Sequence, residues 1–400
     1  MVMKRTRLDE AFAAGVLLPP VAAVPSFVDF VQALAAKLDS SASPSSPNQK
    51  AVADFVGEAE HIVFVLVDGM GWMLLDDLPA GAFLRTQRKM ELRSIFPSTT
   101  GCAIPSLATA CWPCRHGAPG WWAYLEDRDL SIITLPFLER MGQKSLAHYG
   151  VGVPEIWPLS PWLQGFRGSA LSIQPASFVD SPFSQYHRGY TRGQGYRTIA
   201  EAVDSVLAHA SSVAGRGYTY LYLPEFDSAC HGFGVGSEQA RQALQVINGA
   251  LARLATDLRG RARLVIGADH GHLNVPESGH HFLLSNDPLL ALLKAPPAGE
   301  PRTPIFHVRE GQAEKFAEMF NQRFGAIFAL LSSAELAASK LLGPEPLSPL
   351  ATRRFGDFIG IALQLVSLEY QTTLQPTKPD HIGQHGGLTP EEMRIPLIVA

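Results

Sequence analysis

The stretch HIVFVLVDGMG, residues 61–71, is a run of apolar and largely β-branched residues that ends in an Asp-Gly pair. A continuous apolar run of this length is typical of a strand buried on both faces, and hence of a parallel sheet. Two more such runs, residues 218–226 and 262–268, each precede an aspartate. Residues 237–259 between them have apolar side chains at helical spacing, which predicts a right-handed strand–helix–strand unit. We therefore expect an α/β fold around a mostly parallel sheet.

The three runs lead into Asp68, Asp227 and Asp269. In open α/β sheets ligands bind beyond the carboxyl ends of the strands, so we expect these aspartates to converge. Histidines accompany two of them, because His231 lies four positions after Asp227 and His270 follows Asp269. Mixed aspartate and histidine sets suit zinc, and two neighbouring ions can bind both oxygens of an in-line displacement at phosphorus.

One more histidine and a threonine complete the candidate site. His385 lies in GQHGG, residues 383–387, where glycines let the backbone present an imidazole into a crowded pocket. FPSTTG, residues 96–101, precedes a predicted helix, which places Thr100 at a helix N-terminus, where free amides favour an anion. Thr99 competes for the same position, and a plain N-cap role is the alternative for either threonine.

Six motifs occur in a fixed order: VDGMG, FPSTT, LATACWPCRHG, FDSACHG, ADHGH and GQHGG. In their order and approximate spacing they resemble the alkaline-phosphatase superfamily, and within it the type I phosphodiesterase and nucleotide pyrophosphatase family, over residues 60–400. The resemblance implies an alkaline-phosphatase-like three-layer sandwich with a small α+β insertion. It also implies a hydrolase of phosphodiester or pyrophosphate bonds that acts on small phosphate esters.

The resemblance further implies two zinc ions, for which manganese or iron could substitute at the same ligands. The ligands it implies are Asp68, Thr100, Asp269 and His270 for one ion, and Asp227, His231 and His385 for the other. Thr100 would attack phosphorus and form a covalent phospho-threonine intermediate. Three aspartates and two divalent ions give a local charge of −3 + 4 = +1, which suits an anionic substrate.

The sequence departs from the family after His116-Gly117. Nucleotide pyrophosphatases of this family usually have an asparagine shortly after that pair, whereas this chain continues Ala-Pro-Gly-Trp-Trp. The departure bears on nucleotide specificity more than on hydrolysis. Trp121, Trp122 and Tyr124 are either pocket residues or ordinary core residues.

Several residues have two readings. The CWPCR stretch, residues 111–115, fits both a redox pair and a sulfatase signature, but packing is favoured because Thr100 holds the sulfatase nucleophile position. His280 and His281 are expected in a solvent-facing loop, and the role of His272 stays open.

Other activities fit the same scaffold. Phosphonate or phosphate monoester hydrolysis is the main alternative, followed by sulfate ester hydrolysis and by a binding protein without catalysis. A monoester dianion needs an extra cationic group, and no short motif beside Thr100 supplies one, which favours diesters.

The composition describes a globular chain of 400 residues, 46% hydrophobic. Its formal charge, 33 − 37 = −4, argues against a stable nucleic-acid partner. No apolar run reaches the roughly 18 residues of a transmembrane segment. The four cysteines are too few for a disulfide framework, so we expect a cytoplasmic protein.

We expect three parts along the chain. Residues 1–60 form an N-terminal segment that packs on the core and includes a Ser/Pro-rich linker at 39–50. Residues 61–300 and 376–400 form the catalytic α/β core, and residues 301–375 form an inserted α+β cap.

Overall fold

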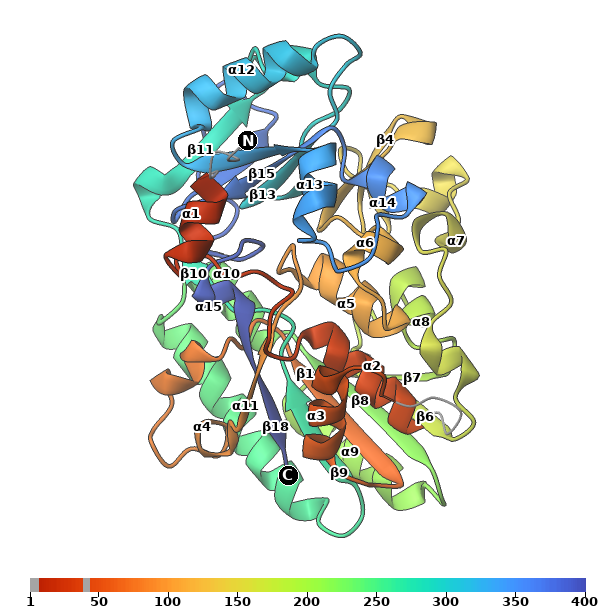
Figure 1. Ribbon diagram of the computed structural model, residues 1–400. Coiled ribbons are helices and arrows are strands. Elements are labelled where there is room, and N and C mark those ends of the chain that lie inside the picture. The colour runs from red at the N-terminus through yellow and green to blue at the C-terminus, as the bar shows by residue number, and fades with distance from the viewer. Residues whose placement is uncertain (1–6, 39–43) are drawn as a thin grey trace.

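The computed structural model describes residues 7–38 and 44–400. Two seven-stranded sheets dominate it, the larger in the lower half of Figure 1 and the smaller in the upper half. The larger sheet has the order β2 (Met90–Arg93), β18 (Arg394–Val399), β9 (Arg263–Gly267), β1 (His61–Val67), β8 (Gly217–Leu223), β6 (Ser169–Pro175) and β7 (Arg192–Tyr196).

The strands of the larger sheet form as their apolar runs predict. Every residue of β1 and β8 is buried, because helices cover both faces of the sheet. β1 pairs in parallel with β8 and β9, whereas β18 runs antiparallel to both its neighbours, β9 and β2. The mostly parallel sheet is confirmed.

Helices cover this sheet in two groups. α9 (Ile199–Ser212) and α11 (Glu238–Asp257) pack together on one face, and α11 provides the predicted crossover from β8 to β9. α2 (Phe27–Leu38), α3 (Pro47–Val56) and α5 (Thr100–Thr109) gather on the other face. The expected three-layer arrangement, with helices on both faces of a mostly parallel sheet, is thereby confirmed.

The N-terminal helices pack directly on the sheet. The ring of Phe30 in α2 lies 4.9 Å from that of Phe64 in β1, centroid to centroid. Of the linker expected at 39–50, residues 39–43 lie outside the described residues. Residues 47–50 are helical instead, because Ser46 caps the N-terminus of α3 and Pro47 occupies its first position.

The smaller sheet joins two distant parts of the chain. Its order is β14 (Phe328–Ser332), β15 (Phe358–Ala362), β13 (Thr303–Phe306), β12 (Ala298–Glu300), β3 (Trp122–Leu125), β4 (Leu130–Ile133) and β5 (Leu138–Glu139). Residues 301–375 supply β13 to β15 together with α12 (Ala313–Phe324) and α13 (Ser333–Ser339), while the remaining strands lie outside that range. The division into core and cap stays a prediction.

Short elements complete the structure: α1 (Arg7–Ala13), α4 (Phe83–Gln87), α6 (Pro113–His116), α7 (Val153–Ile156), α8 (Pro182–His187), α10 (Glu225–Phe233), α14 (Pro349–Arg354), α15 (Pro390–Met393), β10 (Leu273–Asn274), β11 (His280–Leu284), β16 (Ser367–Gln371) and β17 (Gly383–Gln384). In the described part of the chain, no helix combines the length and the hydropathy that crossing a bilayer requires.

A buried ion pair connects the two sheets. Arg302 lies in the turn between β12 and β13, and its Nε and Nη2 donate to the two carboxylate oxygens of Glu392 at 2.6 and 3.0 Å. Both side chains are completely buried. Glu392, in α15 just before β18, also accepts hydrogen bonds from the backbone of Gly387 and Thr389. The pair therefore fixes the segment that contains His385 against the smaller sheet.

We expect Arg302→Met to destabilise the fold by about 3–5 kcal/mol, because it leaves the Glu392 carboxylate buried without its partner. Urea unfolding followed by circular dichroism measures the change. Arg128→Met is the matched control, since Arg128 pairs with Glu155 on the surface. Equal midpoints for the two variants would contradict the importance of the buried pair.

Candidate functional site

The predicted aspartates converge at the carboxyl edge of the larger sheet. Asp68 follows β1 directly, and Asp269 lies two residues beyond β9. The expectation that Asp227 ends a strand is wrong, because β8 stops before Pro224, which has no amide hydrogen to donate. Asp227 instead lies in the first turn of α10, and His231 follows one turn later on the same face.

One group of candidate ligands surrounds Thr100. Asp68, Asp269 and His270 each offer an atom within 4.8 Å of the others. The Thr100 hydroxyl lies 3.3 Å from both carboxylate oxygens of Asp68 and 3.2 Å from Nε2 of His270. Asp269 Oδ2 is buried with no hydrogen-bond partner among the described residues. This group can accept a cation at the Thr100 hydroxyl.

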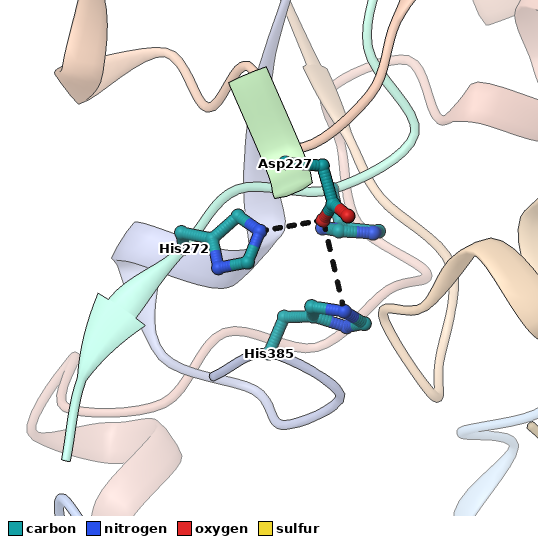
Figure 2. A group of neighbouring side chains, drawn as sticks. Asp227, His272 and His385 are labelled. Atoms are coloured by element: carbon teal, nitrogen blue, oxygen red, sulfur yellow. Dashed lines mark hydrogen bonds and ion pairs between the residues drawn. The ribbon is translucent and has the colours of Figure 1, made fainter. Parts of the chain in front are cut away.

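The second group is centred on Asp227. Its Oδ1 lies 3.5 Å from Nε2 of His231 and 4.0 Å from Nε2 of His385. The two imidazole Nε2 atoms are 3.1 Å apart. His272, whose role the sequence left open, also belongs here, because its Nε2 lies 2.7 Å from Asp227 Oδ1 (Figure 2). Asp227, His270, His272 and His385 form a second set of candidate metal ligands, whose ligand atoms all lie within 4.8 Å of one another.

The backbone fixes the tautomers of the three predicted histidines. Each Nδ1 faces a carbonyl oxygen, which can only accept, so Nδ1 carries the proton and Nε2 presents a lone pair to the site. The contacts are His231 to Gly383 (2.8 Å), His270 to Gly271 (3.0 Å) and His385 to Ser98 (3.1 Å).

This donor set fits metal ions. The Nε2 atoms of His231 and His385 lie 3.1 Å apart, so either a proton or a metal cation must lie between their lone pairs. Two ligands of a tetrahedral zinc ion with bonds of about 2.0–2.1 Å are separated by roughly 3.3 Å. Burial, and then the nearby Asp227 and Asp269 carboxylates, raise the pKa of Asp68 well above its usual value. Divalent cations would offset the cost of keeping the Asp68 carboxylate charged beside two other carboxylates.

The two threonines have different partners. Thr99 is the N-cap of α5: its hydroxyl accepts from the Gly101 amide at 3.4 Å and donates to Oε1 of Glu300 at 2.7 Å. Thr100 is the first residue of the helix, and its hydroxyl faces Asp68 and His270. The N-cap role therefore belongs to Thr99.

Two residues at the site were not predicted from the sequence. The Tyr222 hydroxyl donates a short hydrogen bond to Oδ2 of Asp68. Glu300 accepts hydrogen bonds from the Thr99 hydroxyl and from the backbone amide of Trp121, the latter at 2.6 Å. Tyr222 lies within an apolar run and Glu300 in no motif, so no sequence signal distinguished either one.

A cavity of about 650 Å³ opens beside Thr100. Much of its lining is apolar and comprises Ile104, Trp121, Trp122, Leu135, Phe178 and Phe183. Trp121 and Trp122 are therefore cavity residues, whereas Tyr124 is buried and donates to Asp129. Among the described residues, no lysine or arginine lines this cavity.

The remaining candidates lie outside the site. His280 and His281 were expected in a loop but belong to β11, where His280 contacts the Ser367 hydroxyl at 2.9 Å. Pairing of β11 with β16 keeps both histidines in a strand. All four cysteines are free, so Cys111 and Cys114 form no disulfide.

Comparisons with known proteins identify the family of the chain. The family profile "Type I phosphodiesterase / nucleotide pyrophosphatase" matches residues 62–388. No curated protein sequence matches the chain.

Solved structures share the fold at low sequence identity. Murine ectonucleotide pyrophosphatase/phosphodiesterase 5, an inactive variant in complex with AMP, is 15% identical, with a TM-score of 0.63 over 85% of this chain and 88% of that chain. The human protein of the same name gives a TM-score of 0.64 at 15% identity, over 85% of this chain and 87% of that one. Phosphonoacetate hydrolase from Sinorhizobium meliloti 1021, in complex with phosphonoformate, is 17% identical, with a TM-score of 0.59 over 85% of this chain and 89% of that chain.

The profile covers most of the chain, from β1 to beyond His385, and includes both groups of candidate ligands. The chain therefore belongs to the type I phosphodiesterase / nucleotide pyrophosphatase family of the alkaline-phosphatase superfamily, and is a phosphoric ester hydrolase.

Proposed function

We propose that the protein hydrolyses phosphodiester or pyrophosphate bonds with Thr100 as nucleophile and with two zinc ions bound. Asp68, Thr100, Asp269 and His270 would hold one ion, and Asp227, His231 and His385 the other. The observation that carries the proposal is the position of the Thr100 hydroxyl, within 3.3 Å of Asp68 and His270 and open to the cavity. The ions, when bound, supply Lewis acidity and offset the buried carboxylates.

The chemistry at Thr100 follows from its contacts. The Thr100 hydroxyl contacts Asp68 and Nε2 of His270, and a cation held by these two residues would make the hydroxyl proton easier to lose and so activate the oxygen for attack. Attack forms a bond from Thr100 Oγ1 to phosphorus as the bond to the leaving oxygen breaks, and the leaving group departs as an alcohol or a phosphate. Water then attacks the phospho-threonine, which releases the product and restores the hydroxyl.

The cavity supports diesters over monoesters. A diester has one negative charge and a second substituent, which the apolar wall can bury. A monoester dianion, or a phosphonate with an additional carboxylate, would gain from a cation, and none lines the cavity among the described residues. Hydrolysis of phosphate monoesters or phosphonates on this scaffold is therefore the weaker alternative.

We expect Thr100→Val to lower turnover of bis-p-nitrophenyl phosphate at least 10³-fold, because it removes the nucleophile without changing side-chain shape. Release of p-nitrophenol measures the rate, with p-nitrophenyl phosphate and p-nitrophenyl sulfate tested beside it. Thr109→Val, in the last turn of the same helix and outside the cavity lining, is the matched control and should keep readily measurable activity. Full activity of Thr100→Val would contradict the assignment of the nucleophile. Faster hydrolysis of p-nitrophenyl sulfate than of bis-p-nitrophenyl phosphate by the wild type would contradict the proposed substrate class.

We expect two zinc ions per chain after dialysis, and about one in Asp269→Asn or His385→Ala, because each change removes a ligand from a different group. Elemental analysis of the purified protein gives the count. His280→Ala, at a half-buried histidine outside the site, is the control and should retain both ions. A single ion in the wild type would contradict the two-ion proposal.

We expect Trp121→Ala to lower kcat/KM for bis-p-nitrophenyl phosphate about tenfold, because an aromatic contact of about 1.4 kcal/mol is lost. The rate on p-nitrophenyl phosphate, which has no second substituent, should change little. Equal losses on both substrates would show that Trp121 does not contact the second group.

A further inference from the structure

Glu300, the last residue of β12, is a buried carboxyl group in the cavity wall beside the proposed nucleophile. It is 6% exposed. Its Oε1 accepts two hydrogen bonds, from the Thr99 hydroxyl at 2.7 Å and from the Trp121 amide at 2.6 Å. These donors come from two separate segments, so they fix the orientation of the carboxyl group.

The second oxygen of Glu300 is free to meet a ligand. Oε2 has no hydrogen-bond partner among the described residues, and it is not one of the buried unsatisfied atoms. Glu300 lines the cavity together with Thr100. The bond from Thr99 to Oε1 holds the Glu300 carboxyl group in the wall of the cavity that Thr100 also lines.

Burial makes the neutral form of Glu300 accessible near neutral pH. Burial raises its pKa to about 7, although the Thr99 and Trp121 hydrogen bonds oppose the shift. Because Oε1 already accepts twice, a bound proton belongs on Oε2. A buried carboxylic acid that keeps its proton can act as a hydrogen-bond donor toward an oxyanion.

We propose that Glu300 contacts the substrate directly and that its Oε2–H donates a hydrogen bond to a non-bridging oxygen of the phosphoryl group attacked by Thr100. The inference rests on the proposed phosphodiester hydrolysis. The Glu300 carboxyl group would supply a neutral hydrogen-bond donor in a cavity whose described lining contains no lysine or arginine. A neutral donor stabilises the phosphoryl oxygen without adding a charge.

The matched variants are Glu300→Gln and Glu300→Ala. Glutamine has nearly the same shape, keeps an oxygen to accept from Thr99 and Trp121, and offers an N–H where Oε2–H was. We expect E300Q to retain kcat/KM for bis-p-nitrophenyl phosphate within about threefold. We expect E300A to lose about 10²–10³-fold, the usual cost of removing one donor to a developing oxyanion.

A stereochemical readout separates substrate contact from a structural role. The Rp and Sp isomers of p-nitrophenyl phenyl phosphorothioate place sulfur at different non-bridging positions, and sulfur is a weak acceptor. If Glu300 contacts one position, E300A should lose rate mainly on the isomer with oxygen there. The ratio of the two rates should then shift at least tenfold in E300A and stay near the wild-type ratio in E300Q.

The outcomes are distinct. An unchanged Rp-to-Sp ratio in E300A overturns the contact while hydrolysis by the wild type still supports the proposed function. If E300A fails to fold, E300Q decides, because a loss beyond tenfold in a variant with wild-type zinc content shows that a neutral donor cannot replace Glu300. If the wild type cleaves no diester, the proposed function fails, and this inference with it.

Discussion

Three carboxyl groups, those of Asp68, Asp227 and Asp269, are crowded at one edge of a buried sheet. Within the described residues, no lysine or arginine pairs with any of them, and their ion-pair partners are histidines. Like charges held together in the interior oppose folding unless protons or cations balance them. The strand ends place the carboxylates around one small volume, and the histidine tautomers direct the Nε2 lone pairs toward the same volume. The rest of the site therefore depends on how this negative charge is balanced.

The scaffold holds these groups in position through contacts outside the site. Arg302 and Glu392 form a buried pair that links the smaller sheet to the segment carrying His385. Backbone carbonyls orient the imidazoles from behind. A site built this way needs little reorganisation when it binds a ligand, since its supporting contacts do not depend on that ligand.

The parts of the site that sequence could predict are those set by local rules. Asp68 and Asp269 were found because parallel strands end at a common edge, and His231 because a spacing of four returns to the same helix face. Thr99 and Thr100 could not be separated by propensity, since both cap helices well. The family resemblance favoured Thr100 as the nucleophile, and in the structure the two threonines differ in their contacts with Glu300 and Asp68.

What the sequence did not show depends on contacts between distant segments. Glu300 meets Thr99 from 201 positions away, and Tyr222 meets Asp68 from 154. The smaller sheet pairs β12 with β3 across a similar separation, and no local periodicity encodes that pairing. Packing of the whole chain decides such contacts.

The placement of β18 has a consequence for biosynthesis. This strand, Arg394–Val399, lies between β2 and β9, and among the described residues it is the only strand that pairs with β2 in the sheet. On the ribosome, one edge of β9 and one edge of β2 therefore stay open until residues 394–399 have emerged, and Glu392, the partner of Arg302, arrives nearly as late. Open strand edges invite wrong pairing with other chains. The nascent protein thus has a long interval in which chaperones can act, and its two groups of candidate metal ligands can assemble only after His385 has emerged.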